Sequence, residues 1–109
     1  MKLFVAYRRL NKLLWRGRLP KAVIIPVDDT VMPTCYGLTV NDDGDLDFRV
    51  PLVFINVSRK KREGCIGKTL IHEMIHISEP ELPHGQIFDA LVERYWKLAR
   101  QKIQGLRIL

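Results

Sequence analysis

The chain has 109 residues, of which 47% are apolar and 28% are charged, and its net charge is +6. This length and balance predict a single domain, residues 1–109, with a core of its own, and they exclude a fully disordered chain. The two cysteines, Cys35 and Cys65, stand far apart and outside any CxxC pattern. They argue against a disulfide framework and a thiolate zinc ribbon, and they fit a reducing compartment.

The first residues carry a short apolar run, LFVAY, which Arg8 and Arg9 interrupt at once. The run is too short for the core of a signal peptide. No stretch of the sequence reaches the roughly 18 apolar residues that a membrane span needs. We therefore expect a cytoplasmic protein that does not enter a membrane, and the sequence leaves its oligomeric state open.

The first predicted element is a helix over residues 3–15. Its apolar side chains recur at three- and four-residue spacing, which is typical of one buried helix face. These side chains are Leu3, Tyr7, Leu10 and Leu14. The basic residues that fall largely outside this face are Arg8, Arg9, Lys12 and Arg16. Gly17 and Pro20 end the helix.

Three runs rich in β-branched residues follow, at 21–27, 34–41 and 46–58. Pro26 places the first strand at a sheet edge or a bulge, and Pro51 divides the third run or bends it. Asp43 and Gly44 lie between the second and third runs and predict a tight hairpin turn. The aspartates around this turn lack the ligand spacing of a calcium loop, so we interpret them as a solvated turn.

Two helices complete the predicted fold, one beginning near Ile66 and one over residues 84–103, and Pro80 and Pro83 bound the loop between them. The order α-β-β-β-α-α predicts an α+β fold. We expect an N-terminal helix, a small, mostly antiparallel sheet of three to four strands, and two helices after it.

Residues 72–76 read HEMIH, within the apolar run of the fifth element. Positions i and i+4 of a helix share one face, so His72 and His76 can bind one ion through imidazole nitrogens at about 2.0–2.1 Å. Glu73 would stand beside the ion, where it can take a proton from water and pass it on. The pattern predicts a Zn²⁺ site of zincin type with Glu73 as the catalytic residue, against the alternative of two surface histidines.

A catalytic zinc ion takes three protein ligands and keeps its fourth position open. His84 is the remaining histidine, eight residues after His76, and we predict it to be the third ligand. A metzincin pattern would need glycine and histidine where this chain has Glu79 and Leu82, so that pattern fails. The other candidate ligands, which the sequence leaves open, are Glu79, Glu81, Glu93 and Cys65.

The segments TLIHEMIH and HGQIF together resemble the SprT-like zinc metalloprotease family, whose pattern is HExxH followed by HGxxF. The close resemblance covers residues 69–76 and 84–88, and it implies a minimal catalytic core that hydrolyses peptide bonds in a protein or peptide substrate. It also implies zinc ligation by His72, His76 and His84 and acid–base catalysis by Glu73. Gly85 and Phe88 would then have structural roles, in the turn and in the core.

Basic residues gather in two places, and residues 1–27 hold seven of them without an acidic one. The first group is the polar face of the N-terminal helix, and the second is the run Arg59, Lys60, Lys61 and Arg62. Such asymmetry indicates attraction to polyanions such as DNA, or simply a solvated surface. A nucleic-acid-binding module, or a pseudo-enzyme with a structural zinc ion, are therefore the alternative functions. A peptidase acting on nucleic-acid-associated proteins would combine two of these readings.

Overall fold

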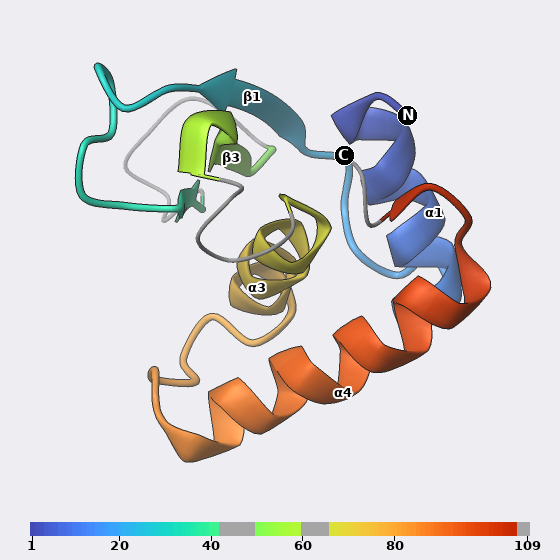
Figure 1. The fold of residues 1–109 in the computed structure, drawn as a ribbon. Helices are drawn as coiled ribbons and strands as arrows, with labels where there is room; N and C mark the ends of the chain where they lie inside the picture. Colours follow the sequence, from blue (N-terminus) through green and yellow to red (C-terminus); the bar gives the residue numbers. More distant parts are fainter. Residues whose placement is uncertain (42–49, 60–65, 107–109) are drawn as a thin grey trace.

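A computed structural model describes residues 1–41, 50–59 and 66–106, and its helices and strands follow the predicted order (Figure 1). The elements are α1 (Leu3–Trp15), β1 (Val23–Val27), β2 (Gly37–Val40), β3 (Leu52–Asn56), a 3₁₀ turn (Val57–Arg59), α3 (Ile66–Ser78) and α4 (Gln86–Lys102). The α+β fold with N- and C-terminal helices is thereby confirmed. The hairpin turn predicted at Asp43 and Gly44 lies outside the described residues.

The three described strands form a mixed sheet in the order β1-β3-β2. β2 pairs with β3 antiparallel, whereas β1 pairs with β3 parallel. The expectation of a mostly antiparallel sheet is therefore met by only one of the two strand pairs. The reason is that the chain leaves β1 through a long connection, residues 28–36, and returns on the far side of β3 instead of turning back beside β1. Pro26 lies in an edge strand, as predicted.

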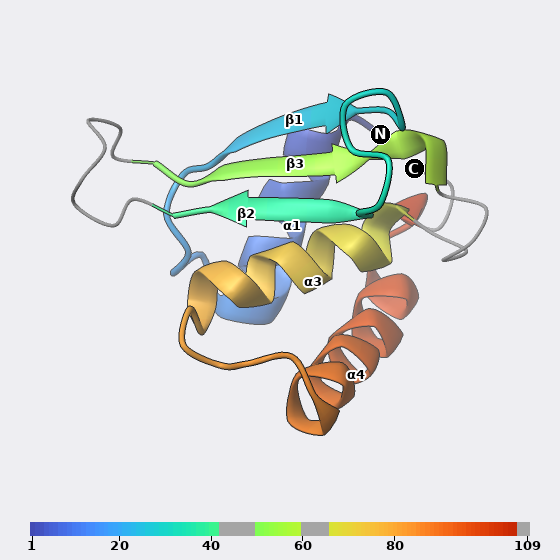
Figure 2. The same cartoon turned by 90° about the vertical axis from the view of Figure 1, so that its left-hand side faces the viewer.

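The helices lie on one side of the sheet (Figure 2). α3 runs beneath the strands at the β2 edge, and α4 lies beyond α3 and crosses it. The side chains that fill the space between these layers are fully buried and include Leu10, Val53, Ile55, Leu70, Ile71, Met74, Ile75 and Phe88. Since apolar burial is the main favourable term in folding, this core fixes α3 against both the sheet and α4. No helix in the described part of the chain is long and apolar enough to cross a membrane.

α1 ends where the sequence indicated, and two side chains of the helix fix the chain that follows. Arg16 adopts a left-handed conformation with φ 55°, and Gly17 follows with φ 77°, a common way to end a helix. The Asn11 amide donates to the Leu19 carbonyl and accepts from the Leu19 N–H, both at 3.1 Å. The Tyr7 hydroxyl donates to the Pro20 carbonyl at 2.6 Å. The path from α1 to β1 is therefore held by hydrogen bonds.

The connection from β1 to β2 is organised by Asn56, a buried polar residue at the end of β3 that is 3% exposed. Its amide nitrogen donates to the carbonyls of Met32 at 2.8 Å and Cys35 at 3.1 Å, and to the carboxylate of Asp29 at 2.9 Å. Its backbone N–H donates to the Tyr36 carbonyl at 2.8 Å. These bonds fix the start of β2 beside α3, which matters for the site.

Candidate metal centre

α3 carries His72 and His76 on the face that lies away from the core. Leu70, Ile71, Met74 and Ile75 bury the opposite faces of the same helix completely, so the helix cannot rotate without exposing them. The centroids of the two imidazole rings lie 5.0 Å apart, as expected for neighbours separated by four residues. The predicted pairing of these two histidines is confirmed.

His84 joins them from the segment that leads into α4. Its Nε2 lies 2.9 Å from Nε2 of His76, and one nitrogen from each of the three histidines falls within 4.8 Å of the others. The next residue is Gly85, whose φ of 158° and ψ of −163° belong to a region that is essentially restricted to glycine. The histidine that follows the loop therefore turns back toward α3, and the three residues predicted as ligands come together.

The ring of Phe88 packs against all three imidazoles. It is fully buried in the first turns of α4, and the centroid of its ring lies 4.6 Å from those of His72 and His76 and 5.0 Å from that of His84. Packing of this kind restricts the ring rotamers of the histidines. The core position expected for Phe88 is confirmed, and its contacts add that it shapes the site directly.

The surroundings of His72 and His76 favour the neutral form of both imidazoles. Burial, together with the neighbouring His76 and His84, lowers the pKa of His72 to about 4, against the opposing effect of Asp89. Burial, with His84 as a second cause, also lowers the pKa of His76. Neutral imidazole is the form that ligates a metal ion. The site is therefore electrostatically prepared for a cation.

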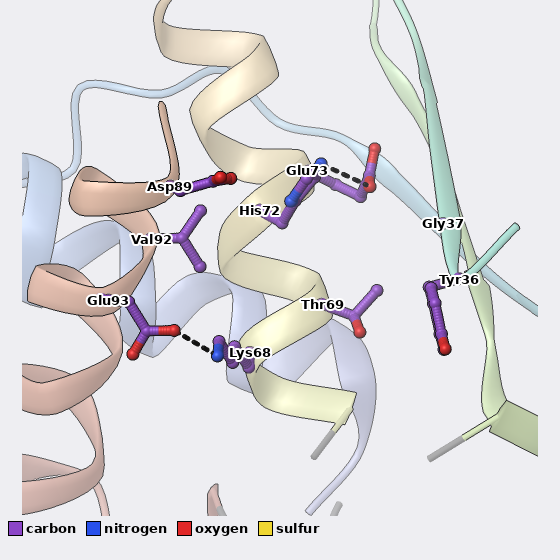
Figure 3. A pocket seen from close by; sticks show the side chains of 9 residues that line it. All are labelled: Tyr36, Gly37, Lys68, Thr69, His72, Glu73, Asp89, Val92 and Glu93. Carbon is purple, nitrogen blue, oxygen red and sulfur yellow. Dashed lines mark ion pairs between the residues drawn. The ribbon is translucent and has the colours of Figure 1, made fainter. Parts of the chain in front are cut away.

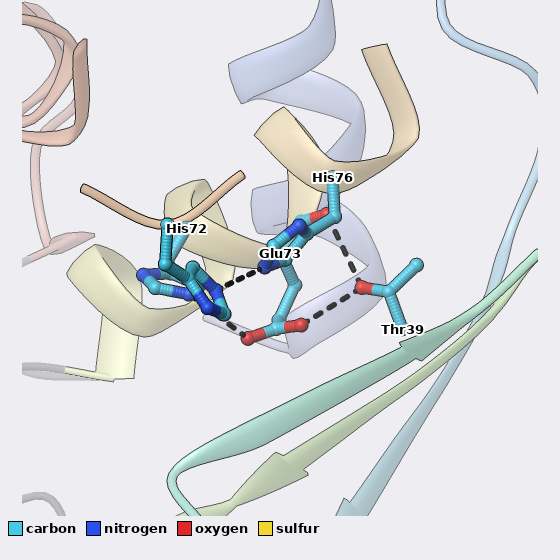
Figure 4. A network of polar contacts seen from close by, with 5 residues as sticks. Thr39, His72, Glu73 and His76 are labelled. Carbon is cyan, nitrogen blue, oxygen red and sulfur yellow. Dashed lines mark hydrogen bonds and ion pairs between the residues drawn. The ribbon is translucent and has the colours of Figure 1, made fainter. Parts of the chain in front are cut away.

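Glu73 lies on the same helix but points toward the sheet, into a site that leaves it 4% exposed (Figure 4). Its Oε2 is 3.9 Å from Nε2 of His72, and its Oε1 accepts a 2.9 Å hydrogen bond from the Thr39 hydroxyl. Burial raises the pKa of Glu73 to about 7, against the lowering effect of Thr39. A carboxyl group with a pKa near neutrality beside a cation site has the properties of a general acid or base.

A cleft of about 470 Å³ opens beside His72 and Glu73 (Figure 3). Its walls come from the start of β2, the first half of α3 and α4, and they consist of Tyr36, Gly37, Lys68, Thr69, His72, Glu73, Asp89, Val92 and Glu93. Lys68 and Glu93 form an ion pair across it. The cleft thus has both apolar and charged walls, and the two candidate functional residues His72 and Glu73 form part of them.

The other ligands left open by the sequence do not join the cluster. The carboxylate of Glu93 pairs with Lys68. Among the described residues, the group that could hold a metal ion at this site consists of the three histidines, without Glu79 or Glu81. Cys65 lies outside the described residues.

The basic residues predicted as a nucleic-acid surface are placed only in part. Arg8, Arg9, Lys12 and Arg16 are exposed on α1, on the side away from the buried face of that helix. Arg9 and Lys12 line a surface depression with Lys102 and Ile103 from the end of α4. Of the second group, Arg59 ends the 3₁₀ turn, and residues 60–62 lie outside the described residues.

Sequence reasoning missed two residues that contact Glu73. Thr39 binds its carboxyl group, and Gly37 lies so close that a Cβ there would be 2.8 Å from Oε2. The sequence did carry a signal, because a glycine inside a strand often marks a close approach of another group, and residues two apart in a strand share one face. It did not identify the group that approaches.

Comparison with known protein families, with curated proteins and with solved structures finds no match to this chain.

Proposed function

We propose that this protein is a zinc-dependent endopeptidase. The observation that carries the proposal is the joint arrangement of three imidazoles within 4.8 Å of one another and a buried carboxyl group whose Oε2 is 3.9 Å from the first of them. Three histidines leave a fourth position for a reacting group, which is the usual composition of a catalytic zinc site.

The donor set fits zinc better than a hard cation. Two nitrogens at about 2.0–2.1 Å from one ion in a tetrahedral arrangement lie roughly 3.3 Å apart, close to the 2.9 Å between His76 and His84. Calcium and magnesium prefer oxygen ligands, whereas imidazole suits zinc and its neighbours in the transition series. His72, His76 and His84 would hold the ion.

A bound zinc ion supplies Lewis acidity, which polarises a peptide carbonyl and makes an attacking water a better nucleophile near neutral pH. Glu73 takes a proton from that water through Oε2, while the water oxygen forms a bond to the carbonyl carbon. Glu73 then gives the proton to the peptide nitrogen as the C–N bond breaks, which leaves a carboxylic acid and an amine. In the metal-free protein, burial raises the pKa of this carboxyl group to about 7, and a group that titrates near neutrality can act as both base and acid.

The edge of the sheet offers a place for an extended substrate. Among the described strands, β2 pairs only with β3 and so presents its other edge beside α3. An extended peptide can add to such an edge through main-chain hydrogen bonds. The cleft between β2 and α4 would then receive a substrate side chain next to the scissile bond.

The resemblance of residues 69–76 and 84–88 to the SprT-like pattern supports the same proposal. The functional positions of that pattern are His72, Glu73, His76 and His84, which are the residues that meet in the site. Gly85 and Phe88, the two structural positions of the pattern, lie in the turn and against the three imidazoles.

The test is hydrolysis of casein and of a quenched fluorescent peptide by zinc-loaded protein, with Glu73→Gln beside Glu81→Gln. Glu81 is exposed in the loop after α3 and serves as the matched control. We expect Glu73→Gln to retain zinc and to lose at least about 100-fold in kcat, the usual contribution of a general acid–base group. Glu81→Gln should keep wild-type activity. Wild-type activity in Glu73→Gln would remove Glu73 from the mechanism, and no hydrolysis by zinc-loaded wild type would overturn the peptidase proposal.

A second candidate function is binding of nucleic acid, alone or as a means of reaching nucleic-acid-associated substrates. It is favoured by the exposed basic residues of α1, two of which line one depression with Lys102. Phosphate contacts would make the affinity fall steeply with salt. Fluorescence anisotropy with labelled single- and double-stranded DNA at low salt tests it, with Arg9→Glu and Lys12→Glu expected to weaken binding; absence of binding to both DNAs removes this candidate.

A further inference from the structure

β2 contacts the carboxyl group of Glu73 through two residues on one face of the strand. Gly37 pairs with Ile55 and Thr39 pairs with Val53 in the antiparallel register with β3. Ile55 and Val53 are fully buried, so this face of the sheet is the one that packs on the helices. Residues 37 and 39 therefore both point toward α3, and Glu73 lies opposite them.

Thr39 binds one oxygen of the carboxyl group. Its hydroxyl is 2.9 Å from Oε1 of Glu73 and 3.2 Å from the Glu73 backbone carbonyl. A hydroxyl carries one proton, so it donates to one of these two acceptors at a time. The shorter contact, to Oε1, is the stronger hydrogen bond, and the longer one, to the backbone carbonyl, keeps the hydroxyl close to α3. The dashed lines of Figure 4 show Thr39 reaching from β2 to both atoms. Oε1 is thereby held on the side of the sheet.

Gly37 leaves room for the rest of the same side chain. A Cβ at this position would lie 2.8 Å from Oε2 and 3.0 Å from both Cδ and Cγ of Glu73. Distances this short cannot be accommodated unless the carboxyl group moves. The bare backbone at position 37 therefore permits Oε2 to lie on the side of His72, 3.9 Å from its Nε2.

We propose that β2 is the positioning element for Glu73: the Thr39 hydroxyl anchors Oε1, and Gly37 provides the space in which Oε2 faces the histidines. The two oxygens then have different tasks, one structural and one available for proton transfer. Such support matters because a glutamate has three side-chain torsions, and catalytic groups work only when held within about 0.5 Å of the productive position. This inference rests on the proposed peptidase function, and it assigns positioning roles to two residues outside the HExxH and HGxxF motifs.

The variants that test the proposal are Thr39→Val, Thr39→Ser and Gly37→Ala. Valine keeps the branched shape and the strand preference of threonine but lacks the hydroxyl, whereas serine keeps the hydroxyl. Thr30→Val is the matched control, because the Thr30 hydroxyl also donates to a carboxylate, that of Asp28, in an exposed turn. Each zinc-loaded variant is assayed for kcat and KM on a peptide substrate, for zinc content and for thermal unfolding.

We expect Thr39→Val and Gly37→Ala to lower kcat by about 10- to 100-fold, as changes in residues that support a metal site do. In Thr39→Val, KM and zinc content should stay near the wild-type values, because the ligands and the walls of the cleft are unchanged. Gly37→Ala should also retain zinc, but its KM is not used as a readout because Gly37 lines the cleft. Thr39→Ser should recover most of the lost kcat, and Thr30→Val should match wild type. A kcat for Thr39→Val close to wild type, or equal losses in Thr39→Ser and Thr39→Val, would overturn the proposal.

A second readout does not depend on activity. The ¹³C resonance of the Glu73 carboxyl group, assigned through its absence in Glu73→Gln, should shift in Thr39→Val and stay in place in Thr30→Val. If that resonance is unchanged in Thr39→Val, the positioning role is wrong. If it shifts while zinc-loaded wild type hydrolyses nothing, the contact between β2 and Glu73 stands and the peptidase function is what fails.

Discussion

His76 and His84 face each other across the loop that joins α3 to α4, with their Nε2 atoms 2.9 Å apart. Eight residues separate them in sequence, and the contact exists because Gly85 lets the chain turn back while Phe88 fixes the start of α4 against the core. The pair ties the last helix to the HExxH helix, so a shared ion should affect both chemistry and stability.

The first prediction concerns the third ligand. His84→Ala should weaken zinc binding by more than about 100-fold, beyond the range seen for residues that only support ligands. Zinc at 100 times its Kd should stabilise wild type by about 2.7 kcal/mol, and the variant should lose this increment. Metal content by mass spectrometry and thermal unfolding with and without EDTA measure both effects. Stoichiometric zinc in His84→Ala would exclude His84 as a ligand.

The second prediction concerns the Phe88 ring, which packs against the three histidines. Phe88→Ala should lower the free energy of unfolding by about 3–5 kcal/mol, the usual cost of removing a buried phenyl ring. Phe88→Leu should retain more stability but loosen the histidines, since the aromatic ring that contacts all three imidazoles is lost. Urea unfolding of metal-free protein separates the core effect from zinc affinity, which is measured by competition with a chelating dye. Equal zinc affinity in Phe88→Leu and wild type would limit Phe88 to a role in the core.

The third prediction concerns pH and the metal-free protein. The pKa of Glu73 rises from 4.5 to about 7 on folding, so between these values the folded state binds more protons and stability falls as pH rises. The pKa of His72 falls from 6.5 to about 4, so its contribution to stability rises with pH between about 4 and 6.5. The two effects oppose each other up to pH 6.5, and above it only that of Glu73 remains.

The measurement is urea unfolding of metal-free wild type and Glu73→Gln from pH 4 to pH 8. The stability of wild type relative to the variant should decline from about pH 4.5 to about pH 7. In the variant, the rise due to His72 and His76, whose pKa values are both lowered on folding, should be visible below pH 6.5. A constant difference between the two proteins over the whole range would contradict the raised pKa of Glu73.

The fourth prediction concerns the connection between β1 and β2. Asn56→Ala removes the amide that binds two carbonyls and the Asp29 carboxylate. A hydrogen bond of this part-buried kind contributes about 0.5–1.5 kcal/mol, and three are lost together, so unfolding should occur at a clearly lower urea concentration. Because this connection leads into Gly37, kcat should fall as well. Ser58→Ala, which removes a hydroxyl that donates to the same Asn56 side chain at 2.7 Å, should have a smaller effect on both.

The sequence predicted the elements whose periodicity is local and missed what depends on their assembly. The apolar spacing in residues 3–15 and around Leu70 and Met74 is a property of single helices, and α1 and α3 lie where it predicts. The parallel pairing of β1 with β3 depends on which side of β3 the chain returns, which strand patterns do not encode. The last helix begins at Gln86 rather than at residue 84, because the turn at Gly85 precedes it.

The same division holds for the site. His72 and His76 are related by helical spacing, and His84 could be added because it is the remaining histidine. Thr39 lies 34 residues before Glu73, and only the packing of β2 on α3 brings them together. Asn56 likewise lies in a predicted strand, and the sequence does not indicate its role, because its three acceptors come from a distant segment of the chain.

The close approach of Glu73 to Gly37 has a use in sequence searches. A five-letter HExxH string recurs by chance, and the string itself does not report whether its glutamate faces an ion. On an edge strand such as β2, a glycine followed two positions later by threonine or serine forms a second sequence pattern, far from HExxH in the chain. Both of its residues contact the glutamate of HExxH. Chains of this architecture that carry both patterns would be the ones to assay first. A chain that keeps HExxH but has a bulky residue at the glycine position would be a candidate for an inactive relative.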